Sequence, residues 1–404
     1  MNIGGKKSTE QGSTTSATTI SQVLPVDDFA QDFSENLKQA YSEQGAVTVC
    51  VFGKSGCGKS TLINTIFGEI VADTGYGRPV TQDSCLYVHE SGNLRLIDSR
   101  GAEIGRDDQQ LQSGLDALVA DSKADGGQGR IHVAWYCVAW NHRRFEDSDV
   151  RLIERLRGHG IPVIVVMTKV PMIGDRIHKD AQTLAESILS RGVPVHMQRV
   201  FPTCALADPY RGQPQHGIAE LLDATYEVVP DEVHAALTSA QQFDFDRKRS
   251  AARKVIATAA AAAGLAGAPP VPVVSMLFTV PAQIAMMAKI AQIYAIPFDR
   301  ARGLAVVVPT LGAQLGRVGA ASLLKLIPGA GPIVGGVIGA AVSAAVTGAL
   351  GCAWAVVCER SAKGEFGPMD LVGNDMLGSL FLSEFKQALS RGTAISRTWN
   401  PKAA

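Results

Sequence analysis

The sequence lacks an excess of charge of either sign, because its 404 residues include 38 basic and 38 acidic side chains. No global field therefore favours nucleic acid as a partner, and we expect none. Cysteine is scarce as well: its seven residues are odd in number and scattered. This pattern suits a reducing, cytoplasmic compartment with buried thiols better than a disulfide framework. The eight histidines have no metal-ligand spacing with each other or with the cysteines.

The N-terminal residues lack the apolar core of a signal peptide. Residues 1–22 are rich in Ser, Thr, Gly and Gln, a composition typical of a disordered tail. The protein is therefore not expected to be secreted. At 404 residues the chain can form two or three domains, each with a core of its own.

A glycine-rich stretch lies directly behind the apolar run 47–52: Gly53-Lys54-Ser55-Gly56-Cys57-Gly58-Lys59-Ser60. A helical pattern at 61–67 follows it. Backbone N–H groups in such a loop curl around an anion, and the helix adds its positive N-terminal end. Lys59 would reach the β- and γ-phosphates, and the Ser60 hydroxyl would coordinate Mg²⁺. The alternative is a glycine-rich turn that binds nothing. With strand and helix both present, the pattern predicts a nucleoside-phosphate site built from Gly53, Ser55, Gly56, Cys57, Gly58, Lys59, Ser60 and Thr61.

Short β-rich runs alternate with helical patterns beyond this loop. Strands are expected at 85–88, 94–97, 131–140, 161–167 and 200–204, and helices near 107–123, 147–158, 178–191 and 216–229. The runs at 131–140 and 161–167 are almost wholly apolar, as in strands buried on both faces of a parallel sheet. The alternation predicts an α/β fold with a doubly wound, mostly parallel sheet that binds its ligand at the carboxyl ends of the strands.

Polar residues follow several of these strands. Thr81 could complete the Mg²⁺ shell and sense the γ-phosphate. Asp98 suits outer-sphere binding of Mg²⁺, and Gly101 can present its N–H to the γ-phosphate. We therefore expect Lys59, Thr81 and Gly101 to act in catalysis, Ser60, Thr81 and Asp98 to hold the metal, and Thr168, Lys169, Cys204 and Ala205 to contact the nucleotide.

These residues give the chain a likeness to a known family. The loop Gly-Lys-Ser-Gly-Cys-Gly-Lys-Ser-Thr-Leu-Ile-Asn, the run Gly-Arg-Pro-Val-Thr-Gln at 77–82 and Trp135-Tyr136-Cys137 resemble the Era-like (TRAFAC-class) bacterial P-loop GTPases. The nearest likeness is to members with an Ala/Gly-rich hydrophobic C-terminal domain of unknown function. A more distant likeness is to the immunity-related and septin-type GTPases. The resemblance covers about 45–360. It implies GTP or GDP and Mg²⁺ as ligands, with Lys59 and Ser60 as phosphate and metal contacts and Thr81 as the switch threonine.

The sequence departs from the family pattern at two functional positions. Pro171 stands where the guanine-reading Asp normally follows Thr168-Lys169, so an ATPase is an alternative, and Asp175 could substitute only if its loop folds back. Ala102 stands where many GTPases place a water-orienting Gln. We therefore expect slow hydrolysis that self-association or an activating protein accelerates.

The second half of the chain is hydrophobic. Residues 255–288 and 326–358 carry no charge, and 333–357 is about long enough to cross a bilayer. Small residues recur every fourth position from 335 to 351, which permits close helix packing. Two interpretations remain open: membrane association through residues 250–360, or an Ala-rich bundle. Prolines within 255–288 favour a hairpin or two packed helices, and the basic residues before this stretch could contact anionic headgroups or form a solvated helix face.

The expected organisation has four parts. These are a disordered polar tail (1–25), a GTP-binding domain (26–235), an all-α hydrophobic domain (236–360), and a C-terminal amphipathic helix and tail (361–404). A short helix at 27–43 and the C-terminal helix have apolar stripes of helical spacing. We expect a GTP-binding protein with slow Mg-dependent hydrolysis, coupled to a membrane-associated helical domain. The alternatives are a membrane-associated scaffold or remodelling protein with little turnover, and an ATPase.

Overall fold

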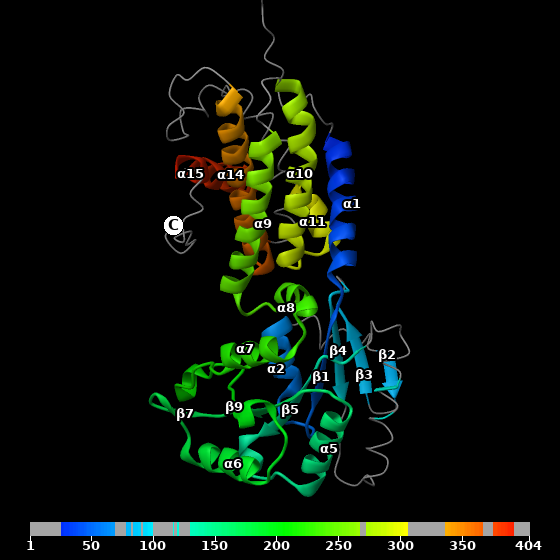
Figure 1. Ribbon diagram of the computed structural model, residues 1–404. Helices are drawn as coiled ribbons and strands as arrows, with labels where there is room; N and C mark the ends of the chain where they lie inside the picture. Colours follow the sequence, from blue (N-terminus) through cyan, green and yellow to red (C-terminus); the bar gives the residue numbers. More distant parts are fainter. Residues whose placement is uncertain are drawn as a thin grey trace, which may run out of the picture.

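The chain forms two bodies that meet at a narrow junction (Figure 1). The computed structural model describes residues 26–68, 78–81, 84–89, 92–99, 116, 119–120, 130–266, 272–305, 336–366 and 375–391. We call residues 47–240 the sheet body. We call the helices that pack at its other end the helical body: α1 (Val26–Gln44), α9 (Phe245–Ala266), α10 (Pro272–Ile293), α11 (Phe298–Ala305), α14 (Gly336–Ala362) and α15 (Asp375–Ser390).

The sheet body contains nine described strands. They are β1 (Val47–Phe52), β2 (Arg78–Thr81), β3 (Ser84–Val88), β4 (Leu94–Ser99), β5 (Val133–Ala139), β6 (Val163–Thr168), β7 (Met172–Ile173), β8 (Arg176–Ile177) and β9 (Val200–Pro202). Seven of them form one sheet in the order β2-β3-β4-β1-β5-β6-β9. Strands β4, β1, β5, β6 and β9 run parallel, while β3 pairs antiparallel with β4 and with β2. This topology confirms the predicted doubly wound, mostly parallel sheet and the hairpin at its edge.

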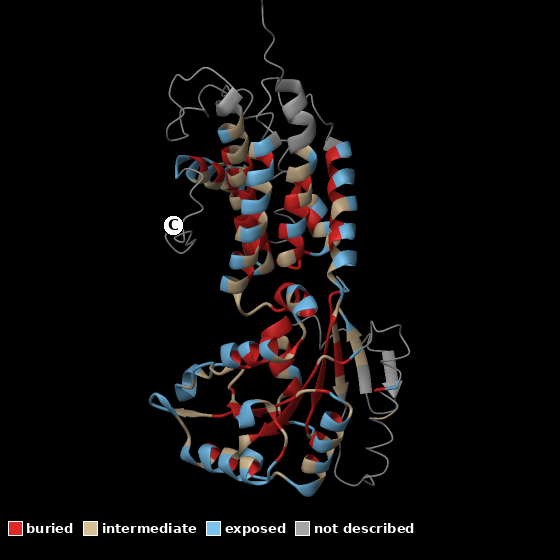
Figure 2. Ribbon diagram, in the orientation of Figure 1, coloured by how far each residue is buried: buried red, intermediate tan, exposed pale blue. Residues whose placement is uncertain are grey.

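Helices cover both faces of this sheet. They are α2 (Lys59–Phe67), α5 (Asp147–Gly158), α6 (Lys179–Ser190), α7 (Ile218–Val228) and α8 (His234–Ala240), with 3-10 turns η2 (Trp140–His142), η3 (His196–Gln198), η4 (Pro209–Arg211) and η5 (Asp231–Val233). Alternate residues of each strand face opposite sides, so α2, α7 and α8 share one core and α5 and α6 the other. Figure 2 shows the central strands buried. Of the helix expected near 107–123, the described residues are Asp116, Val119 and Ala120, all helical.

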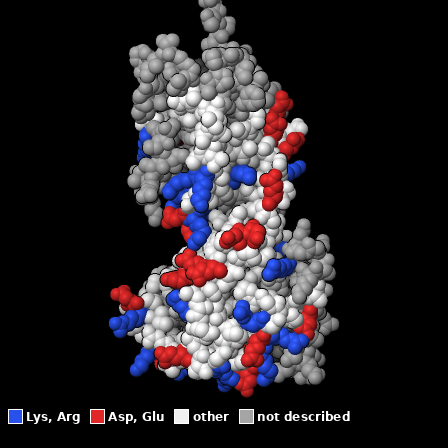
Figure 3. Space-filling view, in the orientation of Figure 1, with Lys and Arg blue, Asp and Glu red and all other residues white. Residues whose placement is uncertain are grey.

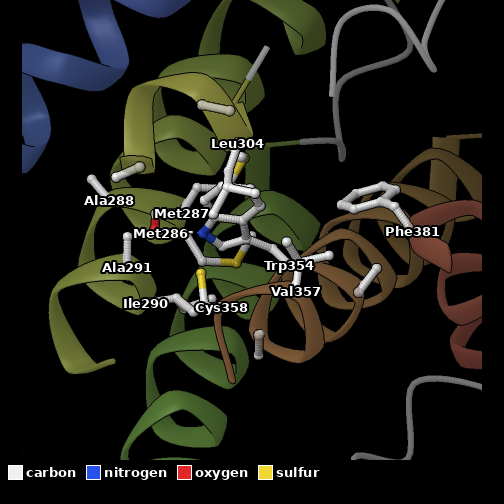
Figure 4. Close-up of a cluster of buried hydrophobic side chains, with 14 of the residues drawn as sticks. Met286, Met287, Ala288, Ile290, Ala291, Leu304, Trp354, Val357, Cys358 and Phe381 are labelled. Atoms are coloured by element: carbon white, nitrogen blue, oxygen red, sulfur yellow. Dashed lines mark hydrogen bonds between the residues drawn. The ribbon is translucent and has the colours of Figure 1, made fainter. Parts of the chain in front are cut away.

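The helical body has a core of its own. Helices α9 and α10 form the hairpin expected from the prolines, and α14 packs against α9, α10 and α15. Trp354 of α14 is fully buried, donates its indole N–H to the Met287 carbonyl at 2.8 Å and meets Phe33 edge to face. Figure 4 shows Trp354 among Met286, Met287, Leu304 and Cys358. The predicted all-α hydrophobic region is therefore a packed bundle.

The helix before the first strand lies in a different place from the one expected. The sequence interpretation put residues 26–44 in the GTP-binding domain, but α1 packs against α10 and α11. Its apolar stripe, including Phe33 and Leu37, is buried in the helical core. Helix α15 joins the same core through Leu377 and Phe381. An apolar stripe shows that a helix is covered but not which body covers it, so the domain boundary could not be derived from the pattern.

A ridge of small residues on α14 lets its neighbours approach closely. A Cβ at Gly351 would lie 2.8 Å from Ile256 Cγ1 of α9 and 2.9 Å from Met286 Sδ of α10. A Cβ at Gly348 would lie 3.9 Å from Ala260, an ordinary contact. The spacing seen in the sequence thus marks a helix-packing surface at least at its C-terminal end.

We predict that Gly351→Val lowers the free energy of unfolding by about 1–3 kcal/mol, because the added atoms overpack the contact among three helices. Gly348→Ala is the matched control and should be neutral or stabilising by up to about 1 kcal/mol, since alanine favours helix and has room. Urea unfolding followed by circular dichroism measures both. Equal stability of the Gly351 variant and the wild type would show that the helices are not packed this closely.

Buried polar contacts join the two bodies at the amino-terminal end of the sheet. Asn93, at the start of β4, donates to the Ser239 hydroxyl of α8 at 2.8 Å, and Ser239 donates to the Gln292 carbonyl of α10. Gln292 in turn donates its side-chain amide to the Ala40 carbonyl of α1. Lys248, fully buried, donates to the carbonyls of Ser239 at 2.7 Å and Ile293 at 2.8 Å. The contacts run without a break from the sheet through α8 to α10 and α1.

Candidate nucleotide site

The glycine-rich loop follows β1 at the opposite end of the sheet from the helical body. Gly53 has φ +138°, and a Cβ there would lie 2.3 Å from the Cys137 carbonyl oxygen. Only glycine therefore fits between β1 and β5. Gly58, with φ +98°, stands at the N-terminus of α2 in the left-handed region. These two glycines let the loop turn sharply into a helix whose first N–H groups remain available for an anion.

Lys59 opens α2, and its side chain crosses the loop it follows. The ammonium group donates to the Gly53 carbonyl at 2.8 Å and to the Lys54 carbonyl at 3.4 Å. The residue is only 8% exposed, so its charge is directed at the loop and not at bulk water. Lys54, in the same loop, pairs instead with Glu146 at 2.8 Å. Only Lys59 of the two is placed to exchange backbone carbonyls for phosphate oxygens.

The end of β6 supports the loop from the side. The Thr168 hydroxyl donates to the Cys57 carbonyl, and Lys169 donates to the Gly56 carbonyl at 2.7 Å. The segment after β9 lies beside them, because the Val170 N–H donates to the Thr203 carbonyl at 3.0 Å. The Ala205 carbonyl accepts from Thr65 of α2 at 3.2 Å. The structure thus brings together the loop, Thr168-Lys169 and the 203–205 segment, as the sequence predicted.

Oxygen donors suitable for Mg²⁺ lie at the same edge. Ser60 is exposed in the first turn of α2. Asp98, near the end of β4, is level with Val51 of β1, two residues before the loop. A hydroxyl and a carboxylate beside a phosphate site match the hard, oxygen-rich coordination of Mg²⁺. The described residues include no cluster of three or more His, Cys, Asp or Glu side chains able to hold a metal by themselves. The donor set fits a metal held jointly with a phosphate ligand.

Two predicted residues cannot be placed in this site. Gly101 lies outside the described residues. Thr81 ends β2, paired with Ser84 at the edge of the sheet, and its side chain is likewise outside the described part. Asp175 is exposed in the turn between β7 and β8, a hairpin that projects from the sheet body (Figure 1). Asp175 is thus exposed to solvent in this structure and is not buried against the phosphate loop.

The sequence analysis did not predict the contacts that side chains of β5 make beneath the loop. Cys137 of β5 lies beside Cys57: a Cβ placed on Gly53 would lie 2.9 Å from Cys57 Sγ and 3.1 Å from Cys137 Cβ. The Tyr136 hydroxyl donates to Asp149 at 2.6 Å. These side chains line a cavity of about 310 Å³ beside the loop. No spacing rule links Cys57 to Cys137, because the contact depends on the pairing of β1 with β5. The position of Cys57 in the phosphate loop, just before the helix, was the available signal.

Comparison with known proteins agrees with this geometry. Residues 48–169 match the family described as 50S ribosome-binding GTPase. They form an Era-like P-loop GTPase domain. The matched range begins within β1, includes the phosphate loop and ends at Lys169, the second residue of the family's base-reading motif. The family match therefore includes the phosphate loop and Thr168-Lys169 and stops just before Pro171, while α6, β9 and α7 of the same sheet body lie beyond it.

Relatives of known function match the GTPase domain and not the whole chain. GTPase Era from Halothermothrix orenii is 29% identical over 137 residues, which cover 33% of this chain and 42% of Era. The probable GTP-binding protein EngB from Streptococcus thermophilus is 26% identical over 154 residues, 38% of this chain and 74% of EngB. The crystal structure of Toc33 from Arabidopsis thaliana with Mg²⁺ and GMPPNP is 19% identical, covers 52% of this chain and 94% of Toc33, and has a TM-score of 0.32. The chain spans less than half of Era's length.

The second half of the chain also has a match. Residues 234–368 match a family described as Domain of unknown function (DUF697). This range contains α8 to α11 and α14. It confirms the likeness to GTPases that carry a hydrophobic C-terminal domain of unknown function.

Cys57 of the GTPase domain has an unusual environment. The interaction with the neighbouring Cys137 thiol, helped by the charge of Lys59, outweighs burial and lowers the pKa of Cys57 to about 7. The pKa of Cys137 is raised in turn, first by its contact with Cys57 and then by burial. A lowered pKa makes Cys57 a thiolate at a pH where an ordinary cysteine is still protonated.

Cys57 is only 1% exposed but lines the cavity of about 310 Å³ beside the loop, which a small reagent can enter. We predict that the rate of its modification by methyl methanethiosulfonate inflects near pH 7, with the peptide identified by mass spectrometry. Cys204 is the internal control, because burial raises the pKa of its thiol and its inflection should lie above that of Cys57. Saturating Mg·GTP should slow the reaction of Cys57 and leave Cys204 unchanged. An inflection of Cys57 at or above that of Cys204 would contradict the lowered pKa of Cys57.

Proposed function

We propose that the protein is a GTP-binding switch that hydrolyses GTP slowly with Mg²⁺ and couples its nucleotide state to the helical body. The observation that carries the proposal is the phosphate loop of the GTPase domain, with Lys59 folded across it and bonded to the Gly53 carbonyl at 2.8 Å. Family membership of residues 48–169 supports GTP as the nucleotide.

The chain's own residues would divide the work as follows. The loop N–H groups and Lys59 bind and orient the phosphates, while Ser60 and Asp98 hold the metal. A bound Mg²⁺ supplies positive charge that stabilises charge developing on the phosphates. Thr168 and Lys169 keep the loop in shape through their bonds to Cys57 and Gly56. Ala102 offers no polar group to orient water, which supports slow turnover without an activating protein or a second copy of the chain.

Base selectivity is the sharpest test of this proposal. Pro171 offers no carboxylate to guanine, and Asp175 stands in the exposed β7–β8 turn. The Thr203 and Cys204 N–H groups already donate to the carbonyls of Met167 and His216, so guanine selectivity would come from the Ala205 N–H, which can meet the guanine O6. We predict that calorimetry with Mg²⁺ shows GTP and GDP binding at least about tenfold more tightly than ATP, about 1.4 kcal/mol. ATP binding equal to or tighter than GTP binding would replace the GTPase by a broader nucleoside triphosphatase.

Helix α14 favours a second function, which is association with a membrane. Within the described residues one helix, Ala340–Ala362, is long and apolar enough to cross a membrane, and 56% of its most apolar stretch is buried inside the bundle. Figure 3 shows an uncharged surface over the middle of the helical body, between acidic side chains along one edge and basic side chains near the junction. We propose that this surface meets a membrane from the cytoplasmic side, so that the protein acts as a membrane-associated switch or scaffold.

Flotation of the full-length protein with anionic vesicles tests this function, with Mg·GDP and Mg·GTP as separate arms. Recovery of the protein with the vesicles is expected, and a difference between the nucleotide arms would favour the switch over a passive scaffold. Protein that stays with the soluble fraction in both arms would leave the Ala-rich bundle as the correct interpretation.

A further inference from the structure

A large cavity lies at the junction, away from the phosphate loop. Its volume is about 870 Å³, and it is bounded by α1, α11 and the end of α14 on one side and by the end of α2 and the β3–β4 turn on the other. Cavities of this size accommodate a drug-sized molecule. Neither family match assigns a ligand to it, and it is separate from the nucleotide site at the opposite edge of the sheet.

Unsatisfied polar atoms belong to the residues that line this cavity. The Ser361 hydroxyl and the Gln242 amide oxygen are shielded from solvent, and neither has a hydrogen-bond partner in the described part of the chain. Ser361 as a whole is 1% exposed. A buried polar group without a partner costs about 1–3 kcal/mol. A hydroxyl and an amide oxygen together are suited to a ligand that both donates and accepts hydrogen bonds.

The walls of the cavity are apolar and its rim is basic. Phe67, Ile296 and Phe298 are among the apolar lining residues. Lys38 and Arg300 lie at the rim, and no described carboxylate lies within ion-pair distance of either. The Lys38 ammonium instead stands 5.2 Å from the centre of the Phe298 ring, and Arg300 donates to the Phe366 carbonyl at 3.2 Å. Asp299 is the one acidic residue among the described side chains that line the cavity, so positively charged side chains outnumber negatively charged ones there.

We propose that this cavity binds a small anionic amphiphile, a molecule with an aromatic or alkyl body and a phosphate or carboxylate group. The body packs against Phe67, Ile296 and Phe298, the polar atoms bond to Ser361 and Gln242, and the anionic group meets Lys38 and Arg300. This site goes beyond the proposed nucleotide function and does not depend on it.

The position of the cavity allows a ligand bound there to influence the nucleotide site through α2. Phe67 and Gly68 form the C-terminal end of α2, whose N-terminal end carries Lys59 and Ser60. The Gln242 N–H donates to the Ile66 carbonyl of the same helix at 2.6 Å. A ligand here touches the far end of the phosphate-binding helix, and any effect it has on nucleotide affinity must be returned by the nucleotide on its own affinity.

The test uses full-length protein preloaded with Mg·GDP and titrated with the anionic aromatic dye 1-anilinonaphthalene-8-sulfonate. Saturable fluorescence enhancement is expected, weakened about tenfold or more by Arg300→Glu and by Ser361→Leu. Lys254→Glu is the matched control, a charge reversal at an exposed cation of α9 outside this cavity, and should leave the dye affinity unchanged. Thermal unfolding checks that each variant is folded.

Displacement of the dye shows whether the ligand needs an apolar part in addition to its anionic group. Dodecyl phosphate and phenyl phosphate are compared with inorganic phosphate, which lacks an apolar body and should not displace the dye at the same concentration. Absence of saturable binding, or binding that Arg300→Glu and Lys254→Glu affect equally, would overturn the proposal and leave a water-filled cavity. Because the dye is titrated with the nucleotide site already filled, failure here is distinguishable from failure of the nucleotide proposal.

Discussion

Replacing Lys59 with alanine is expected to weaken Mg·GTP binding by about a hundredfold or more. The ammonium group is almost buried and already curls over the phosphate loop, 2.8 Å from the Gly53 carbonyl. Phosphate oxygens would take the place of this carbonyl, and each hydrogen bond to a charged group contributes about 1.5–3 kcal/mol. Two such bonds amount to about 3 kcal/mol, or about two orders of magnitude in the dissociation constant. Calorimetry in Mg²⁺ buffer measures the loss.

Lys54→Ala is the matched control for this variant. It removes the same charge from the same loop, but the Lys54 side chain pairs with Glu146 at 2.8 Å, away from the loop carbonyls. We expect less than about a threefold change in affinity, because an exposed ion pair contributes only about 0–1 kcal/mol. Retained affinity in Lys59→Ala, or equal losses in the two variants, would mean that the loop does not bind phosphates as proposed.

Replacing Glu359 with leucine is expected to lower the free energy of unfolding by about 3–5 kcal/mol, the usual cost of leaving one member of a buried ion pair without its partner. Glu359 of α14 is 4% exposed at its side chain and Arg249 of α9 is 8% exposed. Two bonds of 2.8 and 3.0 Å join them. The variant leaves the buried Arg249 charge with only the exposed Asp246 as a described ion-pair partner. Urea unfolding followed by circular dichroism measures the difference.

The double variant Arg249→Met/Glu359→Leu separates the cost of a stranded charge from that of lost packing. It should recover much of the stability, because apolar residues of similar size can replace a buried pair at little cost. A double variant as unstable as the single one would show that the pair matters through shape and not through charge.

The same pair predicts a dependence on pH. Burial on its own raises the pKa of Glu359, but hydrogen bonds from Arg249 and Lys363 outweigh it and hold the pKa below the ordinary value. A carboxyl with a lowered pKa in the folded state stabilises fully above its unfolded pKa of about 4.3. This contribution is lost as pH falls through the folded pKa. The wild type should therefore lose stability below about pH 4.3 more steeply than the double variant.

The fold was predictable because its signals are local. An apolar run followed by a glycine-rich turn and a helix places the phosphate loop without reference to the remainder of the chain. The buried runs that became β5 and β6 are apolar on both faces, which only a sheet covered on both sides explains. Thr168-Lys169 and Ala205 could be placed by order alone, since parallel strands bring their carboxyl ends to one edge.

The contacts that sequence could not predict join residues far apart in the chain. The approach of Cys57 to Cys137 needs the pairing of β1 with β5, and the Arg249–Glu359 pair needs the packing of α9 on α14. The position of α1 could not be predicted because its apolar stripe does not show which of the two bodies covers it. The position of Asp175 could not be predicted either. It depends on the β7–β8 hairpin, whose two-residue strands have no hydrophobic pattern that the sequence could reveal.

The placement of α1 changes how the molecule is divided. Phe33 before the sheet and Phe381 near the other end of the described chain are buried in one core with Trp354, although neither lies within the 234–368 range of the family match. Topologically, the GTPase domain is thus an insertion within a helical domain, tethered to it at 45–46 and again at 241–244. An excised 234–368 fragment would lack two of the helices that close its core. Transplanting the module to another protein therefore requires both ends of this chain.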